Sequence, residues 1–327
     1  MRSLNSFKSK IFHINNQNFE QHALDLFHFQ YRNNKIYHDY IKHLGINHKK
    51  IHSVSNIPFL PIQFFKSQIV KCGDYTAEHV FKSSGTTGNT SKHYIQDLDF
   101  YTKISTWIFQ SFFGPLKNSA IIGLLPSYLE RSNSSLVYMV DHFIKTSENP
   151  YSGFYLSDVN DLMMRLDELR TTNNSIYLFG VTFALLEVAK NHIFKNNRIN
   201  IIETGGMKGR GKELIRDDLH DILKNAFKKG NIFSEYGMTE LLSQAYLKRD
   251  GYFYAPPWMR IYIRDIYDPF AMVENGKTGI IKIIDLANIH SCSFIETEDL
   301  GLSKGDGFKV LGRLDNSDMR GCNLLLT

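Results

Sequence analysis

Apolar residues recur three or four positions apart in two stretches near the start of the chain, residues 19–27 and 37–44. This spacing places them on one face of a helix, so it predicts helices over much of the first fifty residues. The next apolar stretch, residues 57–65, carries two prolines among bulky side chains. Proline disfavours a regular helix, and this stretch is therefore predicted to be extended or turning.

From residue 76 onward, short apolar runs alternate with amphipathic stretches. The runs typical of buried strands cover residues 119–126, 175–180 and 198–206. The stretches with helical spacing cover residues 134–146, 181–194 and 212–230, the last closed by a glycine. A strand followed by a helix, repeated, predicts an α/β fold with a largely parallel sheet.

The last third of the chain has a different pattern. Residues 260–270, 279–286 and 307–314 resemble short strands joined by turns. We therefore expect a helical N-terminal cap region over residues 1–75, an α/β core over 76–250, and a β-rich subdomain with a C-terminal tail over 251–327. Because no low-complexity linker separates these regions, they are expected to form one structural unit overall.

Composition narrows the class of protein. The chain has 327 residues, of which 43% are hydrophobic, and this is enough for a sizeable core. No apolar run reaches the length of a transmembrane helix and the start lacks the features of a signal peptide, which favours a cytoplasmic protein. Its three cysteines show no CxxC spacing. The net charge is +5, and acidic residues occur throughout the chain among the basic ones. Neither a disulfide framework, a zinc site nor nucleic-acid binding is favoured.

A cluster of glycine, serine and threonine, SSGTTGNTSK, occupies residues 83–92. Gly85 and Gly88 would allow close backbone approach to a phosphate, with hydroxyl groups around them and a cation at Lys92. It is not a Walker loop, since no GK[ST] follows the second glycine. Taken alone, such a cluster is more often a solvated turn.

Three later segments supply the other parts of a nucleotide site. In SEYGMTE, residues 234–240, Tyr236 offers an aromatic face, Thr239 a hydroxyl, and Glu240 a carboxylate of the kind that Mg²⁺ prefers. In ETEDLG, residues 296–301, Asp299 could accept both hydroxyls of a ribose. GRLDNSD, residues 312–318, adds Arg313. Together with the glycine-rich loop, these groups indicate ATP.

The ordered set SSGTTG, GG, YGMTE, TED and GRLD resembles the adenylate-forming superfamily of acyl-CoA synthetases, luciferases and adenylation domains. The resemblance implies the large N-terminal domain of those enzymes, with mostly parallel sheets, helices and a β-rich C-terminal subdomain. It also implies that the α/β core binds both a nucleotide and an acyl group.

The resemblance further implies the role of each matching residue. Ser84, Gly85, Thr86, Thr87 and Gly88 would hold the β- and γ-phosphates of ATP; Gly205 and Gly206 would flank the adenine, with Tyr236 and Gly237 beside it; Thr239 would contact the α-phosphate, Glu240 would hold Mg²⁺, and Asp299 and Arg313 would hold the ribose. In two places the chain departs from the pattern. Lys92 stands one position later than the superfamily's lysine, and Glu298 replaces a glycine.

The short length and the ending GRLDNSDMRGCN resemble the LuxE-type acyl-protein synthetases. That resemblance implies that the small mobile C-terminal domain of the superfamily is absent and that Cys322 accepts the acyl group. It also implies activation of a fatty acid and, as partner, an acyl-accepting reductase, transferase or carrier protein. In contrast, Cys72 and Cys292 are expected to be packed thiols.

Two other functions are compatible with these residues. One is an acyl-CoA or acyl-carrier-protein ligase, which forms no protein thioester. The other is a non-catalytic nucleotide-binding partner of a larger complex. Within either of them, Cys322 would be an inert residue on a frayed tail.

Overall fold

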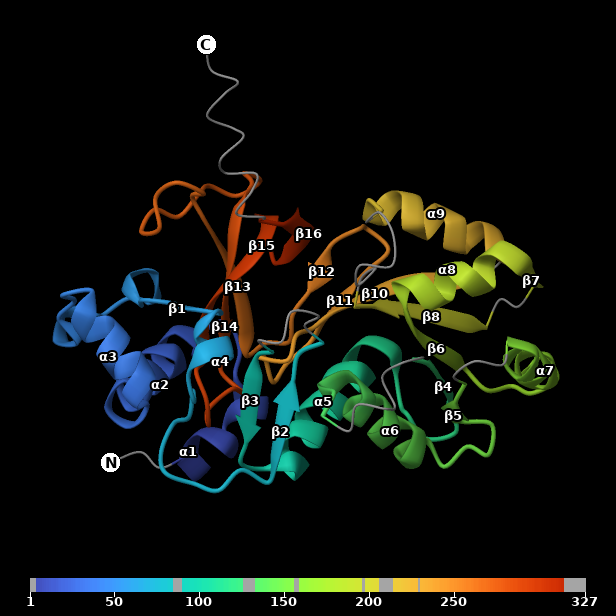
Figure 1. Ribbon diagram of the computed structural model, residues 1–327, viewed down its shortest axis with the longest axis horizontal. Coiled ribbons are helices and arrows are strands. Elements are labelled where there is room, and N and C mark those ends of the chain that lie inside the picture. Colours follow the sequence, from blue (N-terminus) through green and yellow to red (C-terminus); the bar gives the residue numbers. More distant parts are fainter. Residues whose placement is uncertain are drawn as a thin grey trace, which may run out of the picture. The chain divides into compact units, whose positions relative to one another are not determined.

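The computed structural model describes residues 4–84, 90–125, 133–155, 159–195, 198–205, 214–228 and 230–314 (Figure 1). Two compact units make up the chain. One is Thr76–Asp250, and the other joins Met1–Tyr75 to Gly251–Thr327. The three-part organisation expected from the sequence stays a prediction.

A mostly parallel sheet forms the centre of the unit Thr76–Asp250. Its strands run in the order β11, β10, β8, β6, β4, β5, and β11 is antiparallel to β10. The elements of this unit are β2 (His79–Lys82), β3 (Lys92–Ile95), α5 (Leu98–Phe113), β4 (Ala120–Leu124), α6 (Ser135–Ser147), β5 (Gly153–Phe154), α7 (Val159–Leu169), β6 (Ile176–Val181), α8 (Thr182–Asn191), β7 (Phe194–Lys195), β8 (Ile199–Thr204), α9 (Arg216–Ala226), β9 (Phe227–Lys228), β10 (Asn231–Tyr236) and β11 (Ala245–Leu247). The predicted α/β fold is confirmed.

Helices cover both faces of this sheet (Figure 1). On the face covered by α5 and α6, the ring of Phe109 lies 5.0 Å from that of Phe143 and 5.1 Å from that of Tyr177 on β6. The helices α8 and α9 cover the opposite face. His220 of α9 forms a hydrogen bond with the side chain of Ser234 on β10. Because both faces are covered, the strands β4 and β6 are buried along their whole length.

The helix predicted over residues 212–230 is shorter than expected. It ends at Ala226, and Phe227–Lys228 forms the strand β9, which pairs with β7. The rings of Phe194 and Phe227 stack in parallel with their centroids 4.5 Å apart. This packing favours the extended conformation over one more helical turn, although the apolar pattern continues through Phe227.

The second unit combines N-terminal helices with an antiparallel sheet. Its strands run in the order β13, β14, β15, β16, β12, and the short strand β1 pairs in parallel with β15. The elements are α1 (Leu4–Lys8), α2 (Phe19–Asn33), α3 (Lys35–His43), β1 (Leu60–Pro61), α4 (Phe64–Ser67), β12 (Phe253–Tyr254), β13 (Met259–Arg264), β14 (Gly279–Asp285), β15 (Phe294–Lys304) and β16 (Gly307–Arg313), with short 3₁₀ turns at Ile11–His13, His48–Lys50 and Val54–Asn56. The predicted β-rich pattern of the last third is confirmed.

Side chains from distant parts of the chain meet in the core of this unit. Phe294 of β15 stacks on Tyr37 of α3 at 5.9 Å between centroids, and its ring also meets Phe27 of α2 at 6.1 Å. The Tyr37 hydroxyl donates a hydrogen bond to the carbonyl of Pro58. The N-terminal helices and the C-terminal strands therefore share one hydrophobic core.

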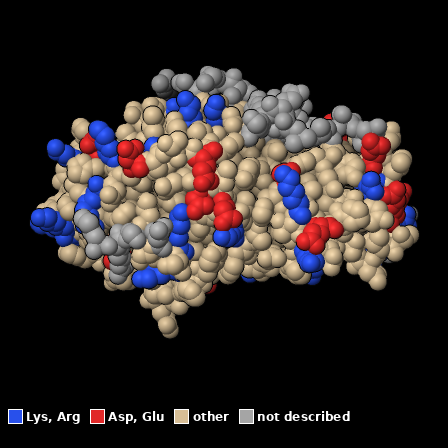
Figure 2. Space-filling model, turned by 90° about the horizontal axis from the view of Figure 1, so that it is seen from below, with Lys and Arg blue, Asp and Glu red and all other residues tan. Residues whose placement is uncertain are grey.

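Charged side chains of both signs lie interspersed on the face shown in Figure 2. Several exposed pairs lie one turn apart on helices: Lys35 with Asp39, Lys103 with Asp99, and Lys145 with Asp141. Such exposed pairs add little to stability, because solvent screens the charges. In the described part of the chain, no helix combines the length and the apolar character needed to cross a membrane.

A single buried glutamine ties α2 to the loop before β15. Gln30 is completely buried, and its Nε2 donates to the carbonyls of Asn288 (3.0 Å) and Ile289 (3.2 Å). Its Oε1 accepts a hydrogen bond from the backbone N–H of Ser293 at 2.9 Å. Gln30 thus bonds to backbone groups as a neighbouring strand would, and it supplies hydrogen-bond partners for the Ile289 carbonyl and the Ser293 N–H in the core.

We expect Gln30→Leu to lower the free energy of unfolding by about 3 kcal/mol, because it leaves the Ser293 N–H and the Ile289 carbonyl without this partner in the core. Chemical denaturation followed by circular dichroism measures this change. The matched control is Gln21→Leu, at an exposed position of the same helix. Equal stability of the two variants would contradict the importance of this contact.

Candidate nucleotide-binding site

Hydrogen bonds close the base of the glycine-rich loop, at residues 82–83 and 91–92, which we call the loop neck. Strands β2 and β3 form an antiparallel hairpin in which Lys82 pairs with Lys92. Beyond this pair, the N–H of Ser83 donates to the carbonyl of Ser91 at 3.0 Å, and the N–H of Ser91 donates to Ser83 Oγ at 2.9 Å. These two bonds close the hairpin end from which Ser84 leads into the loop.

Lys92 is the first residue of β3, and its side chain is exposed. Because side chains alternate along a strand, it points to the face opposite to the buried His93. A lysine lies directly across from it on β2, and like charges in such a position repel each other. The role of Lys92 on a phosphate stays a prediction.

A histidine joins the hairpin to the YGMTE segment. His93 is 1% exposed, and its Nδ1 lies 2.8 Å from the carbonyl oxygen of Thr239. Since a carbonyl oxygen only accepts hydrogen bonds, Nδ1 carries the proton in this contact. This bond connects the loop neck to the turn that holds Thr239 and Glu240. The sequence motifs did not identify His93, and its signal is only the buried alternation Ser91, His93, Ile95.

A second link joins the ends of β8 and β10. Thr204 is the last residue of β8, and its hydroxyl donates to Oε2 of Glu235, the residue before Tyr236. Gly205 follows Thr204 with a φ of +81°, a left-handed conformation that glycine adopts without strain. Gly237 lies so close to Glu235 that a Cβ atom there would be 2.1 Å from Oε1. Glycine is therefore favoured at both positions next to Thr204 and Glu235: at Gly205 by the backbone conformation, and at Gly237 by the lack of space for a Cβ atom.

On the opposite face of the same two strands, Glu203 accepts two hydrogen bonds. Thr182, the first residue of α8, donates to Oε1 at 2.5 Å, and Ser234 donates to Oε2 at 2.9 Å. The Nε2 of His220 lies 2.9 Å from Ser234 Oγ. Burial, aided by nearby Arg216 and Lys224, lowers the pKa of His220 to about 4, so this histidine is neutral at physiological pH. The Glu203 cluster fastens α8 and α9 to the sheet.

Glu235 has an unusual protonation equilibrium. Burial raises the pKa of its carboxyl group to about 7; the Thr204 hydrogen bond opposes this rise, and nearby Glu203 adds to it. Tyr101 of α5 and Tyr246 of β11 also face this carboxyl group, and burial raises the pKa of both phenols. The Tyr246 hydroxyl is buried with no hydrogen-bond partner in the described part of the chain. The Glu235 side chain thus titrates near neutral pH while both tyrosines stay protonated.

The residues of this unit fit ATP and Mg²⁺ in their donor chemistry. Among the described residues, Ser91 Oγ and Gln244 Oε1 are buried without a hydrogen-bond partner, one in the loop neck and one beside Gly237. Nowhere in the described ranges do three or more His, Cys, Asp or Glu side chains gather in a way that could hold a metal. One protein carboxylate, such as that of Glu240, is enough for Mg²⁺, which commonly takes its other ligands from phosphates and water.

The second unit brings Asp299 and Arg313 together. They are register partners on β15 and β16, and Arg313 Nε lies 3.6 Å from Asp299 Oδ1. The Glu298 carboxylate lies 3.5 Å from Arg313 Nη2 and accepts a 2.7 Å hydrogen bond from Gln63. The glutamate that replaces the superfamily's glycine therefore holds the same arginine. Whether Asp299 and Arg313 bind a ribose stays a prediction.

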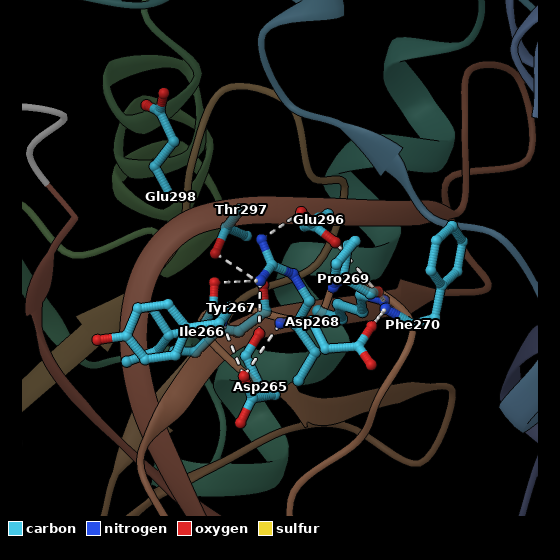
Figure 3. Close-up of polar contacts among 12 residues, drawn as sticks. Asp265, Ile266, Tyr267, Asp268, Pro269, Phe270, Glu296, Thr297 and Glu298 are labelled. Carbon is cyan, nitrogen blue, oxygen red and sulfur yellow. Dashed lines mark hydrogen bonds and ion pairs between the residues drawn. The ribbon is translucent and has the colours of Figure 1, made fainter. Parts of the chain in front are cut away.

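A buried ionic cluster supports β15 just before these residues (Figure 3). Glu296 pairs with Arg264 at 2.8 Å and with Lys282 at 3.5 Å, and Lys282 also donates to the carbonyl of Pro269. Figure 3 shows Glu296 turned toward the loop that carries Pro269, whereas Glu298 points away from it. The cluster thus fixes the loop between β13 and β14 to β15 and leaves Glu298 available to Arg313.

Several predicted site residues lie outside the described residues. They are Gly85, Thr86, Thr87, Gly88, Gly206 and Cys322. Within the unit Thr76–Asp250, the structure places Ser84, Lys92, Gly205, Tyr236, Gly237, Thr239 and Glu240 on the elements described above. Their roles toward a ligand stay predictions.

The fold is that of adenylate-forming enzymes, as similar solved structures show. A 2-hydroxyisobutyryl-CoA ligase in complex with 2-HIB-AMP and CoA matches with a TM-score of 0.66 and 13% identity, covering 97% of this chain and 73% of that chain. ATP-bound MatB from Rhodopseudomonas palustris matches with a TM-score of 0.55 and 14% identity, covering 73% of this chain and 49% of that chain. A luciferase-like enzyme from the mealworm Zophobas morio matches with a TM-score of 0.51 and 13% identity, covering 75% and 60%.

The chain belongs to the family described as acyl-protein synthetase, LuxE, whose model matches residues 9–327. This confirms the family inferred from the motifs. The match covers about half the length of the MatB structures. Among curated proteins, no match is found.

We expect Glu235→Gln to be more stable than the wild type at pH 8, by up to about 3 kcal/mol, and equally stable near pH 4. The folded protein keeps the Glu235 proton between pH 4.5 and about 7, whereas the unfolded chain releases it, so wild-type stability falls as pH rises through this range. Glutamine does not ionise, and the variant avoids this fall. Urea denaturation at several pH values measures the difference.

The matched control is Glu168→Gln, because Glu168 is an exposed residue paired with Arg165 on α7. Its stability should follow the wild-type curve over the same pH range. A Glu235→Gln curve parallel to that of the wild type would mean that Glu235 ionises at its ordinary pKa.

Proposed function

We propose that this protein uses ATP and Mg²⁺ to activate a carboxylic acid, in particular a fatty acid, as acyl-AMP and then transfers the acyl group to the thiol of Cys322. It would thus act as an AMP-forming acid–thiol ligase. Membership of the LuxE acyl-protein synthetase family supports this reaction class. The product would be an acyl-protein thioester for a partner enzyme.

The observation that carries the proposal is the hydrogen bond between His93 and Thr239. Through it, the hairpin that leads into the predicted phosphate loop meets the turn of Thr239 and Glu240, although the two partners lie 146 positions apart in the sequence. A phosphate loop and a metal-binding carboxylate must lie close together to hold one triphosphate. The contact therefore supports joint use of these two motifs.

In the first step, a carboxylate oxygen of the acid attacks the α-phosphorus of ATP. A bond forms between that oxygen and phosphorus, the bond to the bridging oxygen of the β-phosphate breaks, and pyrophosphate leaves. Ser84 and the following loop would hold the β- and γ-phosphates, and Thr239 would contact the α-phosphate. Bound Mg²⁺, held by Glu240, would neutralise charge on the phosphates. Tyr236, with Gly205, Gly206 and Gly237, would bind the adenine, and Asp299 with Arg313 the ribose.

In the second step, the thiolate of Cys322 attacks the acyl carbon, and the bond from that carbon to AMP breaks. The other two cysteines are poorly suited to this task. Cys72 and Cys292 are completely buried, and burial raises the pKa of both thiols, that of Cys72 to about 12. A thiol that stays protonated is a weak nucleophile. The burial of Cys72 and Cys292 therefore leaves Cys322 as the cysteine that we propose as the acceptor.

We place the activity in the cytoplasm, where thiols remain reduced. The thioester would then serve an acyl-accepting reductase, transferase or carrier protein. A thioester keeps the acyl carbon activated, so either reduction or transfer to a second nucleophile could consume it.

Acid-dependent exchange of pyrophosphate into ATP tests the first step. We expect exchange with fatty acids in the presence of Mg²⁺, and none without acid. Incubation with labelled acid should also leave a hydroxylamine-labile label on the wild type that Cys322→Ser lacks, whereas Cys72→Ser keeps it. Exchange by Cys322→Ser should continue, because adenylation precedes thiol attack.

The other outcomes separate the alternatives. Exchange with no protein label, together with an acyl thioester on coenzyme A or a carrier protein, would favour a ligase without a protein intermediate. No exchange over a broad panel of acids would favour a non-catalytic nucleotide-binding partner. A label retained in Cys322→Ser would contradict the role of this cysteine.

We expect His93→Phe to lower kcat/KM for ATP in the exchange reaction about 10- to 100-fold, because it releases the loop neck from Thr239. His93→Asn should recover most of the activity, since its amide N–H can take the place of Nδ1–H. The matched control is His22→Phe, because His22 makes the same kind of bond through Nδ1 to the carbonyl of Asn18. Equal loss in the two Phe variants would contradict a specific role for His93.

A further inference from the structure

The carboxyl group of Glu235 lies between the two segments that would flank the nucleotide. With Oε2 it accepts the hydroxyl hydrogen bond of Thr204, directly before Gly205. Its Oε1 occupies the space beside the Cα of Gly237, where a Cβ would be only 2.1 Å away. One side chain therefore contacts the end of β8 and the start of the turn after β10.

The backbone does not join these segments by itself. The ladder between β8 and β10 ends at the pair Glu203 and Ser234. One residue further on, Glu235 pairs with Tyr246 of β11 and Thr204 pairs with Val181 of β6. β8 is paired with β6 along its whole length, whereas β10 begins to pair with β11 at Glu235, and the bond from Thr204 to Glu235 links the two strands beyond the end of their own ladder.

A carboxyl group is a costly choice for a position that is buried among Tyr101, Tyr246 and Glu203. Burial raises its pKa to about 7, so its ionised form is disfavoured in the folded protein. Glutamine would have the same size and would accept the Thr204 bond without this cost. Groups that lower stability in this way are found mainly at functional sites.

We propose that Glu235 is a positioning residue, which holds the segment at Gly205 and the turn at Gly237 at the spacing that the nucleotide requires. This role rests on the proposed function. The protonated side chain can accept the Thr204 bond without adding a second negative charge beside Glu203. Ionisation adds that charge between the two segments that would flank the adenine, beside Thr204 and Gly237, and it therefore disturbs their spacing and weakens binding.

The test is calorimetric titration of the full chain with ATP and Mg²⁺ between pH 6 and pH 8.5. We expect wild-type affinity to fall through pH 7 relative to Glu235→Gln, from equal values within about twofold at pH 6 to a difference of about fivefold at pH 8.5. The ionisation of ATP itself affects both proteins equally and cancels in the ratio. The control variant Glu168→Gln should follow the wild type at every pH.

A second pair of variants tests the geometry without changing any charge. Thr204→Val removes the donor but keeps the shape, and we expect it to weaken ATP binding about tenfold at pH 6. Thr204→Ser restores the hydroxyl and should bind within about twofold of the wild type. Thr171→Val, which removes an exposed hydroxyl bonded to the carbonyl of Glu168, should have no effect.

The outcomes separate the two proposals. ATP binding by the wild type with the same pH profile in Glu235→Gln, or with full affinity in Thr204→Val, would overturn the positioning role alone. No ATP binding and no pyrophosphate exchange by the wild type would overturn the proposed function and the positioning role together.

Discussion

The point at which the β8–β10 ladder ends governs the candidate site. Up to Glu203 and Ser234, the parallel backbone bonds hold the strands side by side. Beyond this pair β10 pairs with β11 and β8 stays paired with β6, so the ladder between β8 and β10 has stopped. This is the edge of a parallel sheet where ligands bind in open α/β folds. Side chains, rather than backbone bonds, set the spacing there.

Two buried glutamates secure this edge from opposite faces. Glu203, on the face covered by α8 and α9, accepts two hydroxyl hydrogen bonds and fastens those helices. Glu235, on the face covered by α5, accepts one from Thr204 and lies against Gly237. Consecutive residues of a strand point to opposite faces, so adjacent residues can bind two separate layers. Burial is the main reason why the pKa of Glu235 rises to about 7, and the nearby Glu203 carboxyl group adds to this rise.

The spacing of apolar residues predicted most of the helices and strands in this fold. An element that is buried on one or both faces needs apolar side chains at regular intervals. The strands β6 and β8 and the helix α6 lie where their apolar patterns placed them. Where the prediction for α9 failed, the apolar pattern continued past Ala226, but the stacking of Phe227 on Phe194 favoured a strand. A contact between residues 33 positions apart is not visible in a local pattern. In the same way, the pattern of α2 does not distinguish Gln30 from the exposed polar residues of that helix. Gln30 is buried because it forms hydrogen bonds with the loop before β15.

The sequence by itself determined the fold class and the family and predicted the segments of the candidate site, because short motifs need glycine, hydroxyl and carboxylate groups at fixed local spacing. Only the tertiary structure decided which side chains hold those segments together. His93, Thr204 and Glu235 belong to no local pattern that marks them as partners, because their contacts join residues 31 to 146 positions apart. Such contacts depend on strand register and on the face to which each side chain points, and both are fixed only when the sheet assembles.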